Sequence, residues 1–156
     1  MIALVRKLRE VENEVAAERG GIVLVALFQR EDSLGKWDVL FSADWIKRTE
    51  DERPVLDYLI GKLQPKLTQR ELLTVSRVLV FEPNEQFVGL VLGMLQEWGN
   101  PQQLANISIN GMSITTAYII AADLNYAPLP AVPDPESMIR ETAEILDAMR
   151  PDAARP

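Results

Sequence analysis

Residues 22–28 read Ile-Val-Leu-Val-Ala-Leu-Phe, an unbroken apolar run that follows the pair Gly20-Gly21 and precedes a polar stretch. A strand with one face in water alternates apolar and polar residues, whereas a strand covered on both faces is apolar throughout. The run therefore predicts a central strand of a sheet, with other elements layered on both of its faces.

A second strand is predicted over residues 37–45, after a polar loop at residues 29–35. Every other residue is apolar, and three of these are aromatic: Trp37, Val39, Phe41, Ala43 and Trp45. This spacing of two places them on one face of a strand. We expect the two strands to form a hairpin.

Residues 2–18 precede the first strand and show the periodicity of a helix. Leu4, Leu8, Val11 and Val15 recur at intervals of three and four residues, which gives one narrow apolar stripe. Gly20-Gly21 ends the helix. The stripe can dock on the rest of the domain, or it can form the seam of a dimer.

The middle of the chain alternates between helix and strand. A helix opens at Thr49 or Glu50, tolerates Pro54 in its first turn and ends at Pro65. Thr68 and Glu71 have the spacing of a capping box, which predicts one further short helix. Residues 75–81 are mostly apolar and predict a second buried strand, interrupted by Arg77.

Residues 85–98 predict a helix that is apolar almost all round. Such a helix lies inside a core or is half-covered by a partner. Gly89 and Gly93 lie four residues apart on one side of it. Each costs about 1 kcal/mol of helix propensity relative to alanine, so we expect close approach of another backbone there.

Asn110-Gly111 predicts a two-residue hairpin turn of type I′. In that register Ile109 faces Met112 and Ile107 faces Ile114, with Ser108 opposite Ser113 and Asn106 opposite Thr115 on the other face. The second strand of this hairpin can run to Ile120. The hairpin is expected at the edge of the sheet.

The last thirty residues differ in composition from the rest. Residues 127–135 hold four prolines and predict a stiff, extended connector. Residues 136–150 predict a helix packed on the same domain, with an apolar stripe of Met138, Ile139, Thr142, Ile145, Leu146 and Met149. Residues 151–156 are expected to be a disordered tail.

The predicted order is α-β-β-α-β-α-β-β-α. It indicates one α+β domain over residues 1–126, with a mixed sheet of about five strands and helices packed on it. We place a lone buried strand between the two hairpins. The order of elements resembles that of profilin-like and roadblock-like domains with one helix added, and that of small acidic secretion chaperones.

Composition excludes several chemistries. The chain of 156 residues has no cysteine and no histidine, so disulfides, thiolate sites and histidine-based catalysis or metal binding are ruled out. Its net charge of −7 disfavours nucleic acid and membrane surfaces as partners. It has no apolar run of membrane-spanning length and no signal-peptide pattern, so we expect a cytoplasmic protein without a cofactor.

Carboxylates at predicted strand ends carry the enzymatic alternative. Asp38 and Asp44 flank the second strand, and Glu82 follows the third. Paired carboxylates bind Mg²⁺, and Arg77 could hold an anion, which would suit Mg²⁺-assisted hydrolysis of a phosphate ester. The plainer interpretation of Arg77 is an ion pair with Glu82, Asp44 or Asp38.

The preferred hypothesis is a non-enzymatic interaction or adaptor module that acts as a homodimer or binds another protein. Its predicted contact residues come from two helices and a strand end: Leu4, Leu8, Val11, Trp45, Phe87, Val91 and Trp98. The hairpin at 104–120 is a further candidate contact surface. Of the aromatic residues, Trp45 is expected to be the most exposed. A small-ligand pocket between the sheet and the helix at 85–98, lined by aromatic residues, is the third alternative.

Overall fold

A computed structural model describes residues 2–47 and 52–126. They form a five-stranded mixed sheet in the order β3-β2-β1-β5-β4. The elements are α1 (Ile2–Arg19), β1 (Ile22–Arg30), a 3₁₀ turn (Glu31–Ser33), β2 (Trp37–Ala43), α2 (Arg53–Leu63), α3 (Gln69–Thr74), β3 (Val75–Phe81), α4 (Gln86–Glu97), β4 (Gln103–Ile109) and β5 (Met112–Ala122). The predicted α+β class and the order of these elements are confirmed. The connector at 127–135, the helix at 136–150 and the tail at 151–156 lie outside the described residues, as does the helix start at Thr49 or Glu50.

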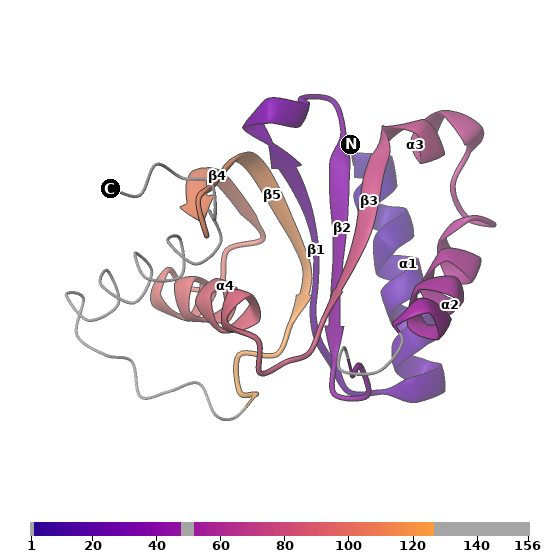
Figure 1. The fold of residues 1–156 in the computed structure, drawn as a ribbon, viewed down its shortest axis with the longest axis horizontal. Helices are drawn as coiled ribbons and strands as arrows, with labels where there is room; N and C mark the ends of the chain where they lie inside the picture. Colours follow the sequence, from indigo (N-terminus) through magenta and orange to yellow (C-terminus); the bar gives the residue numbers. More distant parts are fainter. Residues whose placement is uncertain (1, 48–51, 127–156) are drawn as a thin grey trace.

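β1 is the central strand, as its unbroken apolar run predicts. It pairs in antiparallel fashion with β2 on one side and with β5 on the other. Residues 23–28 are all buried. Figure 1 shows α1, α2 and α3 on one side of β1, β2 and β3, and α4 with β4 on the other side. The two faces of β1 therefore belong to two separate cores.

β3 lies at the edge of the sheet and is partly exposed, so the prediction that residues 75–81 form a buried strand is wrong. It runs parallel to β2 after a crossover through α2 and α3. Ser76 and Arg77 are exposed, while Val78, Leu79 and Phe81 are half-buried. An apolar run reports that the faces of a strand are covered, and it says nothing about whether both of its edges are paired.

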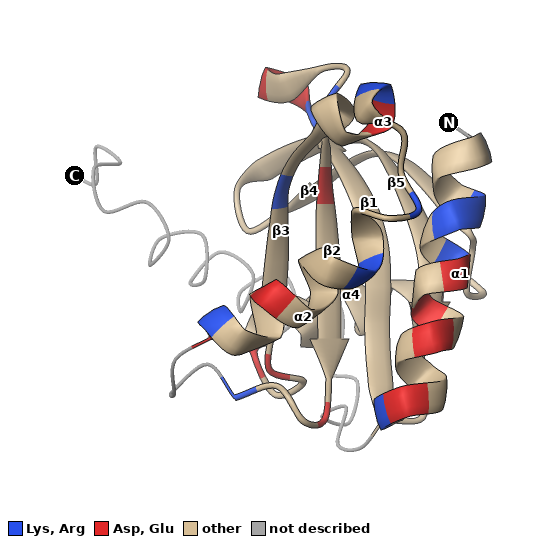
Figure 2. Cartoon of the chain, turned by 90° about the vertical axis from the view of Figure 1, so that its right-hand side faces the viewer, with Lys and Arg blue, Asp and Glu red and all other residues tan. Residues whose placement is uncertain are grey.

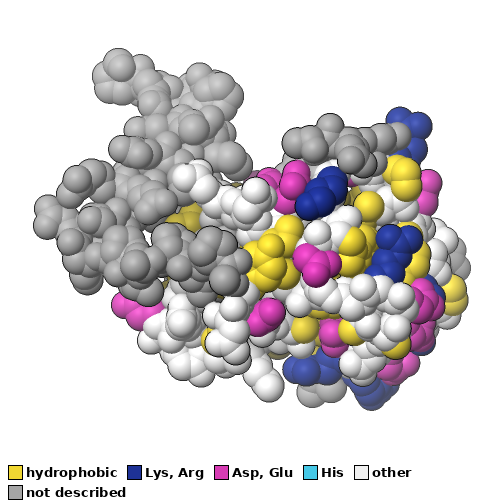
Figure 3. Space-filling model, turned by 90° about the horizontal axis from the view of Figure 1, so that it is seen from below, with side chains coloured by type: hydrophobic (Ala, Val, Ile, Leu, Met, Phe, Trp, Pro, Cys, Tyr) yellow, Lys and Arg dark blue, Asp and Glu magenta, His cyan; other side chains and the backbone are white. Residues whose placement is uncertain are grey.

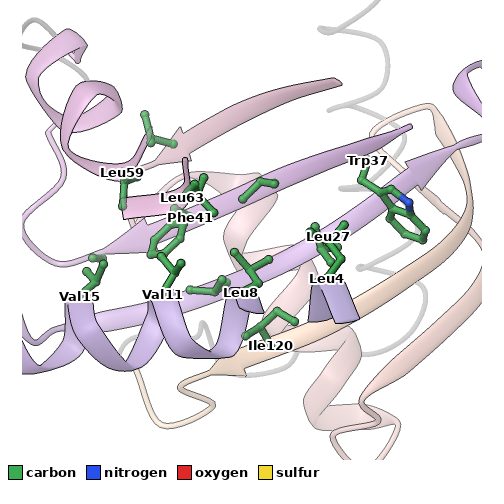
Figure 4. Packing of buried hydrophobic residues seen from close by; sticks show 14 of the residues in the cluster. Leu4, Leu8, Val11, Val15, Leu27, Trp37, Phe41, Leu59, Leu63 and Ile120 are labelled. Carbon is green, nitrogen blue, oxygen red and sulfur yellow. The ribbon is translucent and has the colours of Figure 1, made fainter. Parts of the chain in front are cut away.

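The first core lies between the sheet and the helices α1 and α2. Leu4, Leu8, Val11 and Val15 of α1 all point into it and are 5% exposed or less. Figure 4 shows this stripe facing Phe41 of β2 and its neighbours. Of the two interpretations of the stripe, docking on the domain is the one that the structure shows.

The second core lies between the opposite face of the sheet and α4. Five residues of α4 are buried there: Phe87, Val88, Val91, Leu92 and Leu95. The Phe87 ring stacks on Phe81 with centroids 4.9 Å apart and lies 6.1 Å from Phe28. One side of α4 is thus covered by the sheet, and the other side, which includes Leu90 and Met94, is only partly buried.

The β4–β5 hairpin has the predicted turn and register. Asn110 and Gly111 have φ values of 52° and 81°, the positive values that a type I′ turn needs. Ile109 pairs with Met112, Ile107 with Ile114 and Ser108 with Ser113. Asn106 has φ 54°, and no pairing with Thr115 is formed, so the ladder is irregular at this one position.

A ladder of ion pairs joins α1 to Lys62 of α2 and to Lys66 in the turn that follows it. Lys66 lies 3.6 Å from Glu10 and 2.5 Å from Glu14, and Lys62 contacts Glu14 and Glu18. The acidic positions follow one another along α1 in Figure 2. The Tyr58 hydroxyl also donates to Glu18, at 2.6 Å. The ladder closes the outer side of the first core.

The charges of this region predict loss of stability in acid. Hydrogen bonds from Lys62 and Tyr58 lower the pKa of Glu18 below 4.5, and those from Lys7 and the Thr68 backbone lower the pKa of Glu71. Both groups stabilise the fold above the unfolded pKa, and this contribution is lost as pH falls through the folded pKa. We expect the free energy of unfolding to decrease when the pH is lowered below about 4.5.

Denaturant unfolding followed by tryptophan fluorescence between pH 3 and 7 measures this effect. Glu12 acts in the opposite direction, because burial raises its pKa, and it offsets part of the loss. Glu18→Gln should weaken the decrease of the free energy of unfolding in acid. The free energies of variant and wild type should therefore differ less at pH 3 than at pH 7. An equal difference at both pH values would contradict the assignment.

Candidate functional site

Asp38 lies near the start of β2 and points away from α1. Its neighbours Trp37 and Val39 face the first core, so Asp38 faces the same side of the sheet as α4. It is 3% exposed. A carboxylate this deep needs charged partners, because the cost of desolvating it would otherwise be large.

Two guanidinium groups supply those partners. Nε of Arg30 and Nη2 of Arg77 both donate to Oδ2 of Asp38, each at 3.0 Å. Arg30 also donates to Asp32 at 3.0 Å. The register places Arg77 directly beside Asp38 on the neighbouring strand. The ion-pair interpretation of Arg77 is therefore the one observed, and of the three partners considered, Asp38 is the one bonded to it here.

Three buried oxygen atoms have no hydrogen-bond partner among the described residues: Oδ1 of Asp38, Oγ of Ser42 and Oδ1 of Asn110. Asp38 and Ser42 both lie on the α4 side of β2, but Leu40 separates them. The three atoms are not shown to converge on one point.

Asp44 and Glu82 lie at the opposite end of the strands from Asp38 and Arg77. Asp44 comes six positions after Asp38, which corresponds to about 20 Å at the rise of a strand. Among the described residues no group of three acidic side chains is placed to hold a metal ion. Of the four residues of the hydrolase hypothesis, Asp38 and Arg77 are bonded to each other, and Asp44 and Glu82 lie at the other end of the strands, so the four do not converge on one site.

Asp44 has a structural contact that explains the glycine before β1. Its backbone N–H donates to the Gly21 carbonyl at 2.9 Å. A Cβ on Gly21 would lie 2.1 Å from Oδ1 of Asp44, and Gly21 has φ +64°. A side chain at residue 21 would displace this carboxylate, and the positive φ favours glycine there because other residues rarely adopt it.

The aromatic residues divide into core and surface. Trp37 and Phe41 are buried, and Trp37 packs on Tyr118 with centroids 5.6 Å apart. Trp45 is half-buried, donates from Nε1 to the Gly20 carbonyl at 2.9 Å, and is covered by the Arg19 guanidinium. The prediction that Trp45 is the most exposed is wrong: Trp98 is, at 50%.

The other predicted contact residues lie inside the molecule. Leu4, Leu8 and Val11 belong to the first core, and Phe87 and Val91 to the second. The large apolar side chains that are exposed among the described residues are Leu34, Leu72, Leu73 and Trp98. In Figure 3 hydrophobic side chains reach the surface in separate places between charged ones. The sequence analysis named Trp98 but missed the three leucines. For two of them a signal was present, because Leu72 and Leu73 are adjacent in a helix of only six residues, which cannot bury both.

Two open hollows mark the surface elsewhere. One is lined by Arg30, Glu31, Asp32, Gly111, Met112 and Ser113, and the other by Val5, Arg9, Gln102, Gln103, Tyr118 and Ile119. The small-ligand hypothesis expected an aromatic pocket between the sheet and α4. In that position the Phe87 ring fills the space by stacking on Phe81.

The two edges of the sheet differ in character. β4 carries the positive φ of Asn106 and the exposed polar residues Gln103 and Ser108. β3 contains no residue with positive φ, and Arg77 is its one charged residue. None of the described helices is long and apolar enough to cross a bilayer. Comparison of the chain with protein-family models, curated proteins and solved structures found no match.

Proposed function

We propose that this protein is an interaction module that acts as a homodimer, in which two copies join through the edge of β3. The observation that carries the proposal is the exposed edge itself. A regular, largely apolar edge strand offers a row of backbone groups to any strand that can align with it. β3 extends over Val75–Phe81 and is paired on one side only, with β2, among the described strands.

Proteins usually protect such an edge with charges, bulges or backbone irregularities. β4 has this protection, since Asn106 interrupts the ladder and the strand also exposes the polar residues Gln103 and Ser108. On β3 the single charge is Arg77, and Asp38 of the adjacent strand bonds it at 3.0 Å. β3 has its own register shift at Ser76, but from Arg77 to Phe81 its pairing with β2 is regular, and this regular stretch favours β3 as the edge that pairs with another chain.

A patch of exposed leucines, which we call the leucine patch, lies beside β3. It consists of Leu34, which is 67% exposed, Leu73, which is 68% exposed, and Leu72 at 36%. Lys36 connects its two parts, because its Nζ donates to the Leu73 carbonyl at 2.7 Å. α3 leads directly into β3, so Leu72 and Leu73 lie next to the start of the edge strand, where Ser76 and Arg77 are exposed. An apolar surface next to an open edge is typical of a protein–protein contact.

A second copy of the chain is the partner that we propose. A two-fold axis through the middle of β3 would pair the strand with itself in antiparallel fashion, so one sequence supplies both sides of the contact. The same axis would bring the leucine patch of each copy toward the far end of the partner strand. The product would be one continuous sheet across both copies.

A matched pair of lysine substitutions tests this proposal. Leu73→Lys places a charge in the leucine patch, and Ser108→Lys places the same charge on the exposed β4 edge. We expect wild type and Ser108→Lys to have the mass of two 17.5 kDa chains by light scattering at micromolar concentration, and Leu73→Lys to have the mass of one. Since residue 73 is exposed, thermal unfolding should show that the variant remains folded. A wild-type protein of single-chain mass, or equal masses for both variants, would overturn the proposal.

A further inference from the structure

The side of α4 that faces away from the sheet is small and polar, and Glu97, the one charged residue of the helix, lies on it one turn after Gly93. This side presents Gly89 and Gly93 one helical turn apart, with Leu90 and Met94 beside them and Trp98 just beyond the helix end. α4 contains no lysine or arginine. A Cβ built on Gly89 or on Gly93 would meet no other atom within 4 Å among the described residues.

Nothing in the described fold requires glycine at these positions. Neither has a positive φ, and each glycine lowers helix propensity by about 1 kcal/mol relative to alanine. Two glycines on one side of a helix do have a packing consequence, because the distance between packed helices depends on the side chains at the contact. This surface can accept another helix at close range.

The chain itself supplies a candidate for that place. It continues for thirty residues after Tyr126, and the last described residues stay close to α4. Leu124 and Tyr126 pack against the second core, and the Asp123 N–H donates to the Val23 carbonyl at 2.8 Å. The continuation therefore starts from the side of the sheet on which α4 lies.

The sequence of the continuation matches the surface in pattern and length. Its apolar residues recur at helical spacing: Met138, Ile139, Thr142, Ile145, Leu146 and Met149. A helix over residues 136–149 would be about 21 Å long, close to the length of about 18 Å for α4. The nine residues before it can extend over about 28 Å, so the helix can start at either end of α4.

We propose that residues 136–149 form an amphipathic helix that packs on the Gly89/Gly93 side of α4. Tethering favours this segment over a second copy, since a short linker gives an effective concentration of about millimolar. The proposal goes beyond the homodimer and is independent of it: α4 becomes a helix between two layers of its own chain, and the β3 edge is left for association.

Cysteine pairs test the contact, because the natural chain contains no cysteine. Met94→Cys is combined in the full chain with Thr142→Cys or Ile145→Cys on the apolar stripe, and with Glu144→Cys on the opposite side as control. We expect an intramolecular disulfide at least roughly tenfold faster with one of the stripe positions, since cysteines whose Cα atoms are more than about 7 Å apart do not bridge without backbone movement. Equal rates on both sides, or disulfides only between two chains, would overturn the proposal.

Glycine substitutions give a second readout with opposite signs. Gly61→Ala in α2 is the control, because Gly61 is exposed and a Cβ there meets nothing within 4 Å among the described residues. It should raise Tm through helix propensity. Gly93→Ala should lower Tm, because the added methyl group lies against the packed helix. A rise in Tm for both variants would contradict the contact. Adding Leu73→Lys, which targets the proposed dimer, should leave the Tm changes of both glycine variants as they are.

Discussion

Phe87→Ala is expected to lower the free energy of unfolding by about 3–5 kcal/mol, the range for removing a large aromatic residue from a core. The ring is 7% exposed and stacks on Phe81 at 4.9 Å, so its loss leaves a cavity between α4 and the sheet. For a chain of this length the loss corresponds to a decrease in Tm of roughly 6–20 °C. Denaturant unfolding and thermal unfolding both measure it.

Two comparisons separate a core role from a contact role. Gln96→Ala on the exposed side of α4 should change stability little, and Phe87→Leu should cost much less than Phe87→Ala because volume is largely kept. Folded Phe87→Ala should keep the association of wild type. If the variant instead loses association at unchanged stability, Phe87 is a contact residue and the packing described above does not determine its role.

Leu8→Ala is expected to cost about 2–5 kcal/mol, the second large effect. Leu8 is fully buried at the centre of the α1 stripe, between Leu4 and Val11. α1 packs on the sheet through this stripe, so shortening one side chain creates a cavity under the helix. Arg6→Ala, at an exposed position of the same helix, is the control and should lie within about 0.5 kcal/mol of wild type.

The concentration dependence of unfolding decides between the two interpretations of the stripe. If α1 packs within its own chain, the effect of Leu8→Ala is the same at low and high protein concentration. The proposed β3 dimer already makes the wild-type midpoint depend on concentration, whereas a dimer seam at α1 would make the effect of Leu8→Ala itself change with concentration. An effect of Leu8→Ala that vanishes at high concentration would favour the seam.

Periodicity in the sequence was sufficient to predict the elements and the central place of β1. The apolar run at 22–28, the alternation at 37–45 and the Asn110-Gly111 turn each report a local requirement of the backbone. β1 extends to Arg30, two residues beyond the predicted end, because its last residues still pair with β5. Local patterns do not contain that pairing.

The place of β3 could not be predicted in the same way. Its residues are apolar because α2 and the neighbouring elements cover much of its faces, and this gives the same pattern as a strand at the centre. Whether β3 lies at the edge or at the centre depends on which strands pair with the two edges of β1. This pairing is a long-range property of the chain. β1 pairs with β2 and β5, so β3 is left outside.

The candidate site shows a similar division. The sequence indicated that Arg77 needs a carboxylate, because a charge inside an apolar strand is costly to desolvate. Choosing Asp38 over Asp44 and Glu82 required the register of β2 against β3, which places residue 77 beside residue 38. The leucine patch depends on the same register, since Leu34 and Leu73 are far apart in sequence and the observed link between their segments is the hydrogen bond from Lys36 to the Leu73 carbonyl.

The parallel pairing of β2 and β3 has a consequence for the order in which the molecule assembles. The hairpins β1–β2 and β4–β5 close over short turns, whereas β3 can join only after residues 44–74 have been brought back across the sheet. Closing a long loop costs entropy before its contacts compensate, so such strands join late. The edge that we assign to self-association is then the last part of the sheet to form. A chain can therefore dimerise through this edge only after its own sheet is complete.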